Sequence, residues 1–347
     1  ITPSYQGCIG APFSVTVTIN PIPVISNVSI PICSGSPFSV SPNNNPPSQI
    51  VPSGTLYAWS APSVTGGITG GSAQVNQAAI AQTLTNPTNL PQTATYTVTP
   101  TSGAAGSCAG ATFTVVVTVN PTPLIPTQNV IACSGSSFTS NLQNALPTTI
   151  IPAGTTYTWG NPVVTGGITG ASAQINQANI SQTLTNPSNI QQTATYLVTP
   201  TSGAAGSCQG ANFTFIATIN PVPSIPAQNI SVCSGTNFLV NPVNGNPNTV
   251  VPNATTYSWT APVITGGITG GSAQNNQATI SQTLSNPTNI PQTAIYTVTP
   301  TSGAAGSCPG TSFSVTVTVN PTPIIPNQTQ IICSNNPFLI ALQNNPP

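Results

Sequence analysis

The sequence predicts an all-β protein built as a tandem array of antiparallel β-sandwich domains with a period of 100 residues. The strand pattern is the first observation behind this prediction. FSVTVTIN at 13–20 alternates apolar and polar side chains, the pattern of a half-buried strand, and it returns as FTVVVTVN at 113–120, FTFIATIN at 213–220 and FSVTVTVN at 313–320. Apolar residues also make up 38% of the chain, whereas disordered chains combine low hydrophobicity with high net charge. We therefore expect a folded β protein.

The second observation is the regular recurrence of cysteine, tryptophan and tyrosine. These residues fall in four phases, each repeated every 100 residues: Cys8, Cys108, Cys208 and Cys308; Cys33, Cys133, Cys233 and Cys333; Trp59, Trp159 and Trp259; Tyr96, Tyr196 and Tyr296. Solenoid repeats are roughly 20 to 50 residues long, whereas a β-sandwich domain needs about 100. The period therefore predicts independent sandwich domains in series.

Proline predicts the domain boundaries. Each of the four recurring strands runs directly into a Pro-x-Pro sequence, where strand pairing should stop and a short, stiff polyproline-like connector should begin. The predicted units are a terminal strand of a preceding repeat at 1–20, complete Ig-like repeats at 21–120, 121–220 and 221–320, and the start of a following repeat at 321–347. Since the chain starts at Ile1 with no signal sequence and both ends cut through a unit, we expect it to be a window from a longer array.

Within one unit the sequence predicts about seven short strands. They lie near 24–30, 38–40, 55–60, 81–89 and 94–100 and from Phe113 onward, with a glycine-rich crossing at 64–74. Trp59 on the strand at 55–60 and Tyr96 on the strand at 94–100 occupy the places of the core tryptophan and corner tyrosine of immunoglobulin-like sandwiches. We expect these residues and their repeats, Trp159, Trp259, Tyr196 and Tyr296, to pack in the cores rather than to form a ligand site.

Composition excludes most kinds of functional site. The chain contains no Lys, Arg, Asp, Glu or His, so it lacks the usual groups for proton transfer, the carboxylates that bind calcium and the positive charges that bind nucleic acid. We expect no enzymatic activity, no cofactor, no metal, no nucleic-acid partner and no membrane-spanning segment. Stability should also be nearly independent of pH from about 3 to 7.

The ordered motifs resemble a known family. CSGSPFSV at 33–40, YAWS at 57–60, IAQTLTNPTN at 80–89 and TATYTVTPTS at 93–102 are similar to the PKD-like, Ig-type domains arrayed in giant surface proteins of gliding and biofilm-forming Bacteroidota. The resemblance implies a cell-surface protein of the kind that includes SprB-type gliding-motility adhesins, which the type IX secretion system exports. One departure is that SAPSVTGG at 60–67 replaces the acidic stretch that better-known PKD domains carry after the tryptophan.

The cysteines favour structural disulfides in an oxidising, extracellular setting, because none forms a C-x-x-C pair. Three pairings are open: Cys33 with Cys108 inside one domain, Cys8 with Cys33 across a boundary, or the bottom of one domain with the exposed loop of the next. We favour the first, since a domain that folds alone gains about 3 to 5 kcal/mol from closing such a loop on itself. The candidate disulfide residues are Cys33, Cys108, Cys133, Cys208, Cys233 and Cys308.

The octapeptide TSGAAGSC is identical at 101–108, 201–208 and 301–308. Its small residues predict a tight turn that every domain needs, because glycine adopts backbone conformations that other residues avoid. Two other interpretations are a repeated contact face along the rod, since sandwich loops often carry binding residues, and recent duplication without selection on the loop.

Three functions fit these features. The leading one is a stalk or filament of a giant secreted adhesin, used in gliding motility or surface attachment. The alternatives are a self-assembling sheath or fibre and a polysaccharide-binding repeat module, although aromatic residues make up only 5% of the chain. We expect the partners to be neighbouring repeats of the same long chain and, beyond them, surface polysaccharide or laterally packed like chains.

Overall fold

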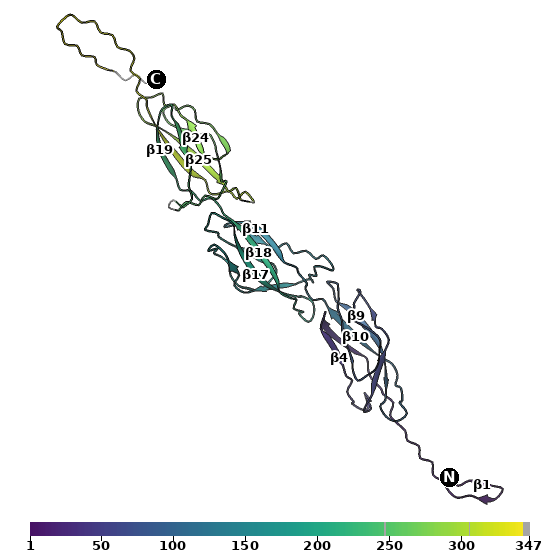
Figure 1. The fold of residues 1–347 in the computed structure, drawn as a ribbon. Helices are drawn as coiled ribbons and strands as arrows, with labels where there is room; N and C mark the ends of the chain where they lie inside the picture. The colour runs from purple at the N-terminus through teal and green to yellow at the C-terminus, as the bar shows by residue number, and fades with distance from the viewer. Residues whose placement is uncertain (246–247, 305, 343–347) are drawn as a thin grey trace.

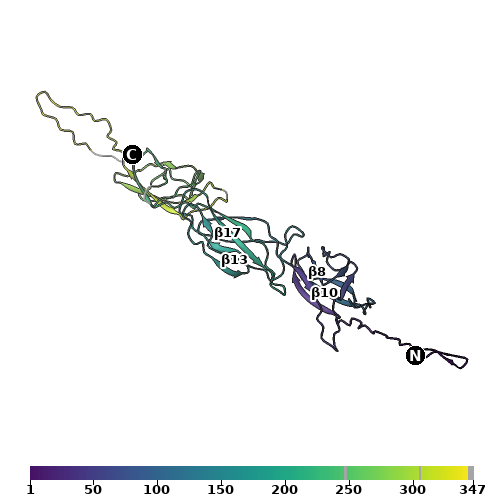
Figure 2. The same cartoon turned by 60° about the horizontal axis from the view of Figure 1, so that its bottom comes forward.

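The computed structural model describes residues 1–245, 248–304 and 306–342. It contains three β-sandwich domains joined end to end, which form an elongated rod with the two chain termini at opposite ends (Figure 1). The domains keep this end-to-end order when the rod is turned (Figure 2). The regular elements within the described ranges are all strands, as the sequence predicts.

Each domain contains eight strands. The first consists of β3 (Val28–Cys33), β4 (Pro37–Val40), β5 (Leu56–Trp59), β6 (Ser63–Val64), β7 (Gln74–Gln77), β8 (Ile80–Thr83), β9 (Gln92–Thr101) and β10 (Phe113–Asn120). The second consists of β11 (Gln128–Cys133), β12 (Ser137–Thr139), β13 (Thr156–Trp159), β14 (Val163–Val164), β15 (Gln174–Gln177), β16 (Ser181–Thr183), β17 (Gln192–Thr201) and β18 (Phe213–Asn220). The third consists of β19 (Gln228–Cys233), β20 (Asn237–Val240), β21 (Thr256–Trp259), β22 (Val263–Ile264), β23 (Gln274–Gln277), β24 (Ile280–Thr283), β25 (Gln292–Thr301) and β26 (Phe313–Asn320).

The larger sheet of the first domain has the order β3-β10-β9-β5-β7, with β6 paired to β9, and β4 and β8 form a separate two-stranded sheet opposite it. The other two domains repeat this arrangement. The expectation of purely antiparallel sheets is wrong for one pair in each domain, because the first strand runs parallel to the last (β3 with β10, β11 with β18, β19 with β26). Each of these two strands runs away from the linker that enters its domain and toward the linker that leaves it, so they share a direction.

The core of each domain lies between the two sheets. Alternate residues of the long strands β9 and β10 are fully buried, including Tyr96, Val115 and Val117, and they pack against Phe38 of β4 and Ile80 of β8. The apolar residues of the alternating sequence pattern are therefore buried, and the polar residues between them are more exposed. Two further strands, β6 and β7, lie at the two ends of the glycine-rich crossing, and the sequence pattern does not reveal them.

Residues 13–20 are the exception among the four recurring sequences that predict a strand, because they form none. In the domains, the equivalent strand β10 lies between β9 and β3 and buries Val115, Val117 and Val119. Residues 13–20 have no such neighbours in the structure, and the side chain of Val17 is 75% exposed. The terminal segment instead contains a short hairpin of β1 (Ser4–Tyr5) and β2 (Cys8–Ile9). Among the described residues, no helix has the length and apolar character needed to cross a bilayer.

Candidate functional site: the disulfide-linked junctions between domains

Each domain has an exit end, where its last strand finishes, and an entry end, where that strand begins. The parallel pairing of β3 and β10 places Cys33 directly beside Asn120, at the exit end of the first domain. The same register places Cys133 beside Asn220 and Cys233 beside Asn320. Cysteines of this phase therefore face the next domain in the rod.

Hydrogen bonds hold the exit end in one conformation. The backbone N–H of Ser34 donates to the carbonyl of Asn120 at 2.9 Å, and the Ser34 hydroxyl accepts from the backbone N–H of Asn86 at 2.9 Å. The buried Asn86 side chain donates to the carbonyls of Leu90 and Val119 at 2.8 and 2.9 Å. Since Ser34 follows Cys33 directly, this network fixes the position from which the thiol approaches its partner.

The TSGAAGSC octapeptides, here called junction loops, lie at the entry ends. In the loop at 201–208, the N–H of Ser202 donates to the Cys208 carbonyl at 2.9 Å, and the N–H of Ser207 donates to the Ala204 carbonyl at 3.1 Å. Gly203 packs so closely on its own domain that a Cβ would lie 2.5 Å from the Ala153 carbonyl oxygen. The loop is therefore a closed double turn held against the domain that carries it.

The outer side of each junction loop meets the preceding domain. Gly206 has a φ of +91°, and a Cβ there would lie 3.3 Å from the side-chain nitrogen of Asn120. At the preceding boundary, the side chain of Asn20 donates a hydrogen bond to the carbonyl of Ala105. Asn20 and Asn120, the last residues of the recurring strand sequences, thus lie against the next junction loop. The loop therefore needs small residues at its tip.

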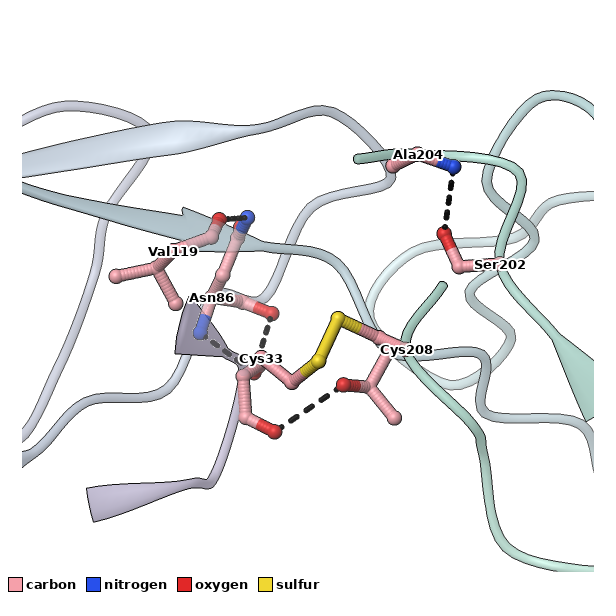
Figure 3. The surroundings of a disulfide bond; sticks show 8 residues. Cys33, Asn86, Val119, Ser202, Ala204 and Cys208 are labelled. Atoms are coloured by element: carbon pink, nitrogen blue, oxygen red, sulfur yellow. Dashed lines mark hydrogen bonds between the residues drawn. A yellow bond between two sulfur atoms is a disulfide. The ribbon is translucent and has the colours of Figure 1, made fainter. Parts of the chain in front are cut away.

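Two disulfides close the junctions. Cys33 bonds to Cys208 and Cys133 to Cys308, with Cα–Cα distances of 5.5 and 5.7 Å. Figure 3 shows the first bond between the two domains, with Asn86 and Val119 on one side and Ser202 and Ala204 on the other. Cys208 and Cys308 are fully buried in these contacts, at 1% and 0% exposed.

The favoured pairing of Cys33 with Cys108 is therefore wrong. Cys33 lies at the exit end, whereas Cys108 precedes β10 at the entry end, and the eight residues of β10 separate these ends by about 25 Å. A disulfide requires Cα atoms within about 7 Å of each other. The third alternative, from the bottom of one domain to the loop of the next, is the pairing in the structure. Cys8, Cys108, Cys233 and Cys333 are free.

The linkers also belong to the junctions. Pro121 and Pro123 are buried, and the Thr122 hydroxyl between them donates to the Ser34 carbonyl at 3.1 Å. Leu124 then forms a β-bridge with Ile150 of the second domain. The linker, which the prolines predict only as a short, stiff polyproline-like connector, is therefore packed against both domains.

The aromatic residues lie in the domain cores. Trp59 and Tyr96 pack edge to face with ring centroids 6.4 Å apart, and the other two domains repeat this contact with Trp159 and Tyr196 and with Trp259 and Tyr296. The Tyr96 hydroxyl donates to the side-chain oxygen of Gln82 on the opposite sheet at 2.8 Å. Gln82 and the Trp59 indole N–H both donate to the Ser72 carbonyl, at 2.8 and 3.0 Å. Burial raises the pKa of Tyr96, Tyr196 and Tyr296 to about 12.

A comparison with solved structures finds similar chains at low sequence identity. Three N-terminal domains of the bacteriophage RB49 outer capsid protein Hoc share 13% identity with this chain and match 85% of it and 96% of their own length, with a TM-score of 0.34. The titin I-band fragment I67-I69 shares 10% identity over 86% and 97% of the two chains, with a TM-score of 0.28. Mouse cadherin-23 EC22-24 shares 13% identity over 85% and 96%, with a TM-score of 0.25. No curated protein matches the chain in sequence.

The sequence itself matches the PKD-like domain three times, over residues 30–123, 128–223 and 230–323. These matches cover most of the chain, and each contains the eight strands of one sandwich apart from the first residues of β3 and β19. Tandem repeats of this kind are non-catalytic structural modules, and the interdomain disulfides indicate an extracellular protein. The chain belongs to the PKD-like domain family.

Proposed function

We propose that this chain is part of the stalk of a giant secreted cell-surface adhesin of the SprB type, used for gliding motility or surface attachment. The observation that carries the proposal is the covalent junction: each described boundary between complete domains has a disulfide, a packed linker and a fitted loop. A binding module on a flexible tether needs none of these features, whereas a projecting stalk needs all its domains held in line.

The proposal includes the units at the two ends. We propose that residues 1–20 end a preceding repeat and residues 321–347 begin a following one, with repeats at 21–120, 121–220 and 221–320 between them. Cys108 and Cys233 occupy the same positions in their domains as the bonded Cys208 and Cys133. In a longer array they would bond to the flanking repeats in the same way.

A polysaccharide-binding role has less support. Sugar-binding surfaces commonly use exposed aromatic rings, and the tryptophans and tyrosines of the three sandwiches are buried. The exposed aromatic side chains of the described residues lie in the two terminal segments, at Tyr5, Phe13 and Phe338.

A self-assembling sheath remains the second candidate, because one specific surface favours it. Strand β7 and its repeats β15 and β23 lie at an open sheet edge, and Val75 of β7 and Ile175 of β15 are exposed there. No charged side chain guards these edges against pairing with another chain. Regular side-by-side packing of rods in electron micrographs of the native material would support the sheath over a solitary stalk.

Labelling of living cells tests the stalk proposal. The loop at 143–148 (QNALPT) is exposed, and the equivalent sequences NNNPPS at 43–48, VNGNPN at 243–248 and QNNPP at 343–347 differ from it, so an antibody against it marks one site on this chain. Labels that travel along the cell would support a motility adhesin, and static labels an attachment stalk or sheath. A variant with NNNPPS from 43–48 in place of QNALPT controls for specificity, and absence of labelling on intact cells would contradict an exposed stalk.

A further inference from the structure

Two strands run side by side through the length of the middle domain. β11 and β18 are parallel and in register from Gln128 beside Phe215 to Cys133 beside Asn220 (Figure 1). Both run from the entry end to the exit end. They differ in the segments of chain to which they are covalently connected.

β18 follows Cys208, which is bonded to Cys33 at the end of β3. β11 ends at Cys133, which is bonded to Cys308 shortly before β26. The first covalent track therefore runs through β3, the disulfide to Cys208, β18, the linker and β19. The second runs through β10, the linker, β11, the disulfide to Cys308 and β26. The other strands of the middle domain lie outside both tracks.

The contour length of each track is only slightly greater than the distance that the track spans. The stretch from Cys208 to Cys233 crosses the second and third domains with about 25 residues, whose contour is about 85 Å at 3.4 Å per residue. Two sandwiches of about 35 to 45 Å each need nearly all of that length. Most of the stretch is already extended, as β18, the proline linker and β19. Pulling can therefore straighten it very little.

We propose that the staggered disulfides make the rod inextensible, because tension passes along two short covalent tracks and bypasses most of each domain. A sandwich joined only through its two ends lengthens by about 300 Å when it unfolds, since about 100 residues then become extended. Here the strands outside the tracks can unfold without lengthening the loaded path. The inference deepens the proposed stalk function, on which its biological purpose rests, and gives the stalk a fixed length under load.

Single-molecule stretching tests the proposal on the isolated chain. One handle is attached to the thiol of Cys108 and the other to a C-terminal tag, with Cys8, Cys233 and Cys333 changed to Ser. In the oxidised protein the load passes from Cys108 to Cys133 and from Cys308 onward, and we expect no domain-sized unfolding step. Reduction should release the 175 residues between Cys133 and Cys308, which lengthens the contour by about 600 Å.

Two variants form a matched pair, since each lacks one disulfide. Cys33→Ser with Cys208→Ser breaks the track that these handles do not load, so the oxidised protein should stay inextensible. Cys133→Ser with Cys308→Ser breaks the loaded track, and the oxidised protein should then extend by domain-sized steps, which also shows that its domains fold. Domain-sized steps in the oxidised parent, or equal extension of the two variants, would overturn the proposal. Neither result bears on where the protein acts in the cell, which the labelling experiment decides.

Discussion

Alkaline pH should destabilise this protein through its buried tyrosines, and mainly through one of the two in each domain. Tyr96, Tyr196 and Tyr296 are fully buried, and burial raises their pKa from about 10 to about 12. The neutral phenol is therefore favoured in the folded state. Its contribution to stability is complete below pH 10 and is lost as pH rises from 10 toward 12.

The size of the effect follows from the shift. Each pKa unit corresponds to about 1.4 kcal/mol, so the loss per domain is about 1.4 kcal/mol at pH 11 and approaches about 2.7 kcal/mol above pH 12. Tyr57, Tyr157 and Tyr257 add to it, since burial raises their pKa as well. Between about pH 3 and 7 we expect a flat profile, because the sequence contains no Asp, Glu or His.

The assay is urea unfolding followed by tryptophan fluorescence at a series of pH values, with the free thiols alkylated beforehand to prevent disulfide exchange. Each domain has one tryptophan, so every domain reports its own unfolding. Changing Tyr96, Tyr196 and Tyr296 to Phe should lower stability at pH 7 by about 1 to 2 kcal/mol per domain and flatten the alkaline decline. A decline centred between pH 4 and 7, or an unchanged alkaline decline in the Phe variant, would refute the reasoning.

Three further results are expected. Asn186→Ala should destabilise the second domain by about 2 to 3 kcal/mol in urea, because it leaves the buried carbonyl of Ile219 without its donor, whereas Ala at the exposed Asn179 should change stability by less than about 0.5 kcal/mol. Gly206→Val should prevent the first interdomain disulfide and raise the number of free thiols from four to six. Gly135→Val introduces the same positive-φ strain with no neighbouring atom within 4 Å and should leave the count at four. Pepsin digestion without reduction should give disulfide-linked peptides for Cys33 with Cys208 and for Cys133 with Cys308, each pair 175 residues apart in the sequence. A peptide that joins Cys33 to Cys108 would contradict the fold.

Sequence reasoning predicts the local structure well because local patterns determine it. The alternation in FTVVVTVN matches the buried and exposed positions of β10, and Trp59 and Tyr96 lie in the core. The partner of the Tyr96 hydroxyl was beyond prediction, since Gln82 lies on the opposite sheet and nothing in the spacing brings the two together. Strands β6 and β7 were missed because they are short and mostly exposed, so they leave no apolar pattern.

The cysteine pairing failed for a different reason. The stabilisation expected from closing a loop with a disulfide depends on the number of residues enclosed, and it contains no information on the direction of the strands that carry the cysteines. The first strand of a domain leaves the entry linker, so Cys33, its last residue, lies at the far end of the domain. The last strand runs toward the exit linker, so Cys108, which precedes it, lies at the near end. The order of linker, strand and cysteine in the sequence therefore contained the signal for a bond between neighbouring domains.

The structure also explains why the junction loop is invariant. Recent duplication alone would keep every loop alike, but the exposed loops SPNNNPPS at 41–48 and NLQNALPT at 141–148 have diverged. Within them Asn44 recurs as Asn144, and each accepts a hydrogen bond from a backbone N–H seven residues later. The asparagine that makes this contact is thus retained, while most of its neighbours have changed. In TSGAAGSC nearly every position closes the turn, packs on its own domain, meets the preceding asparagine or forms the disulfide, so geometry leaves it little freedom to vary.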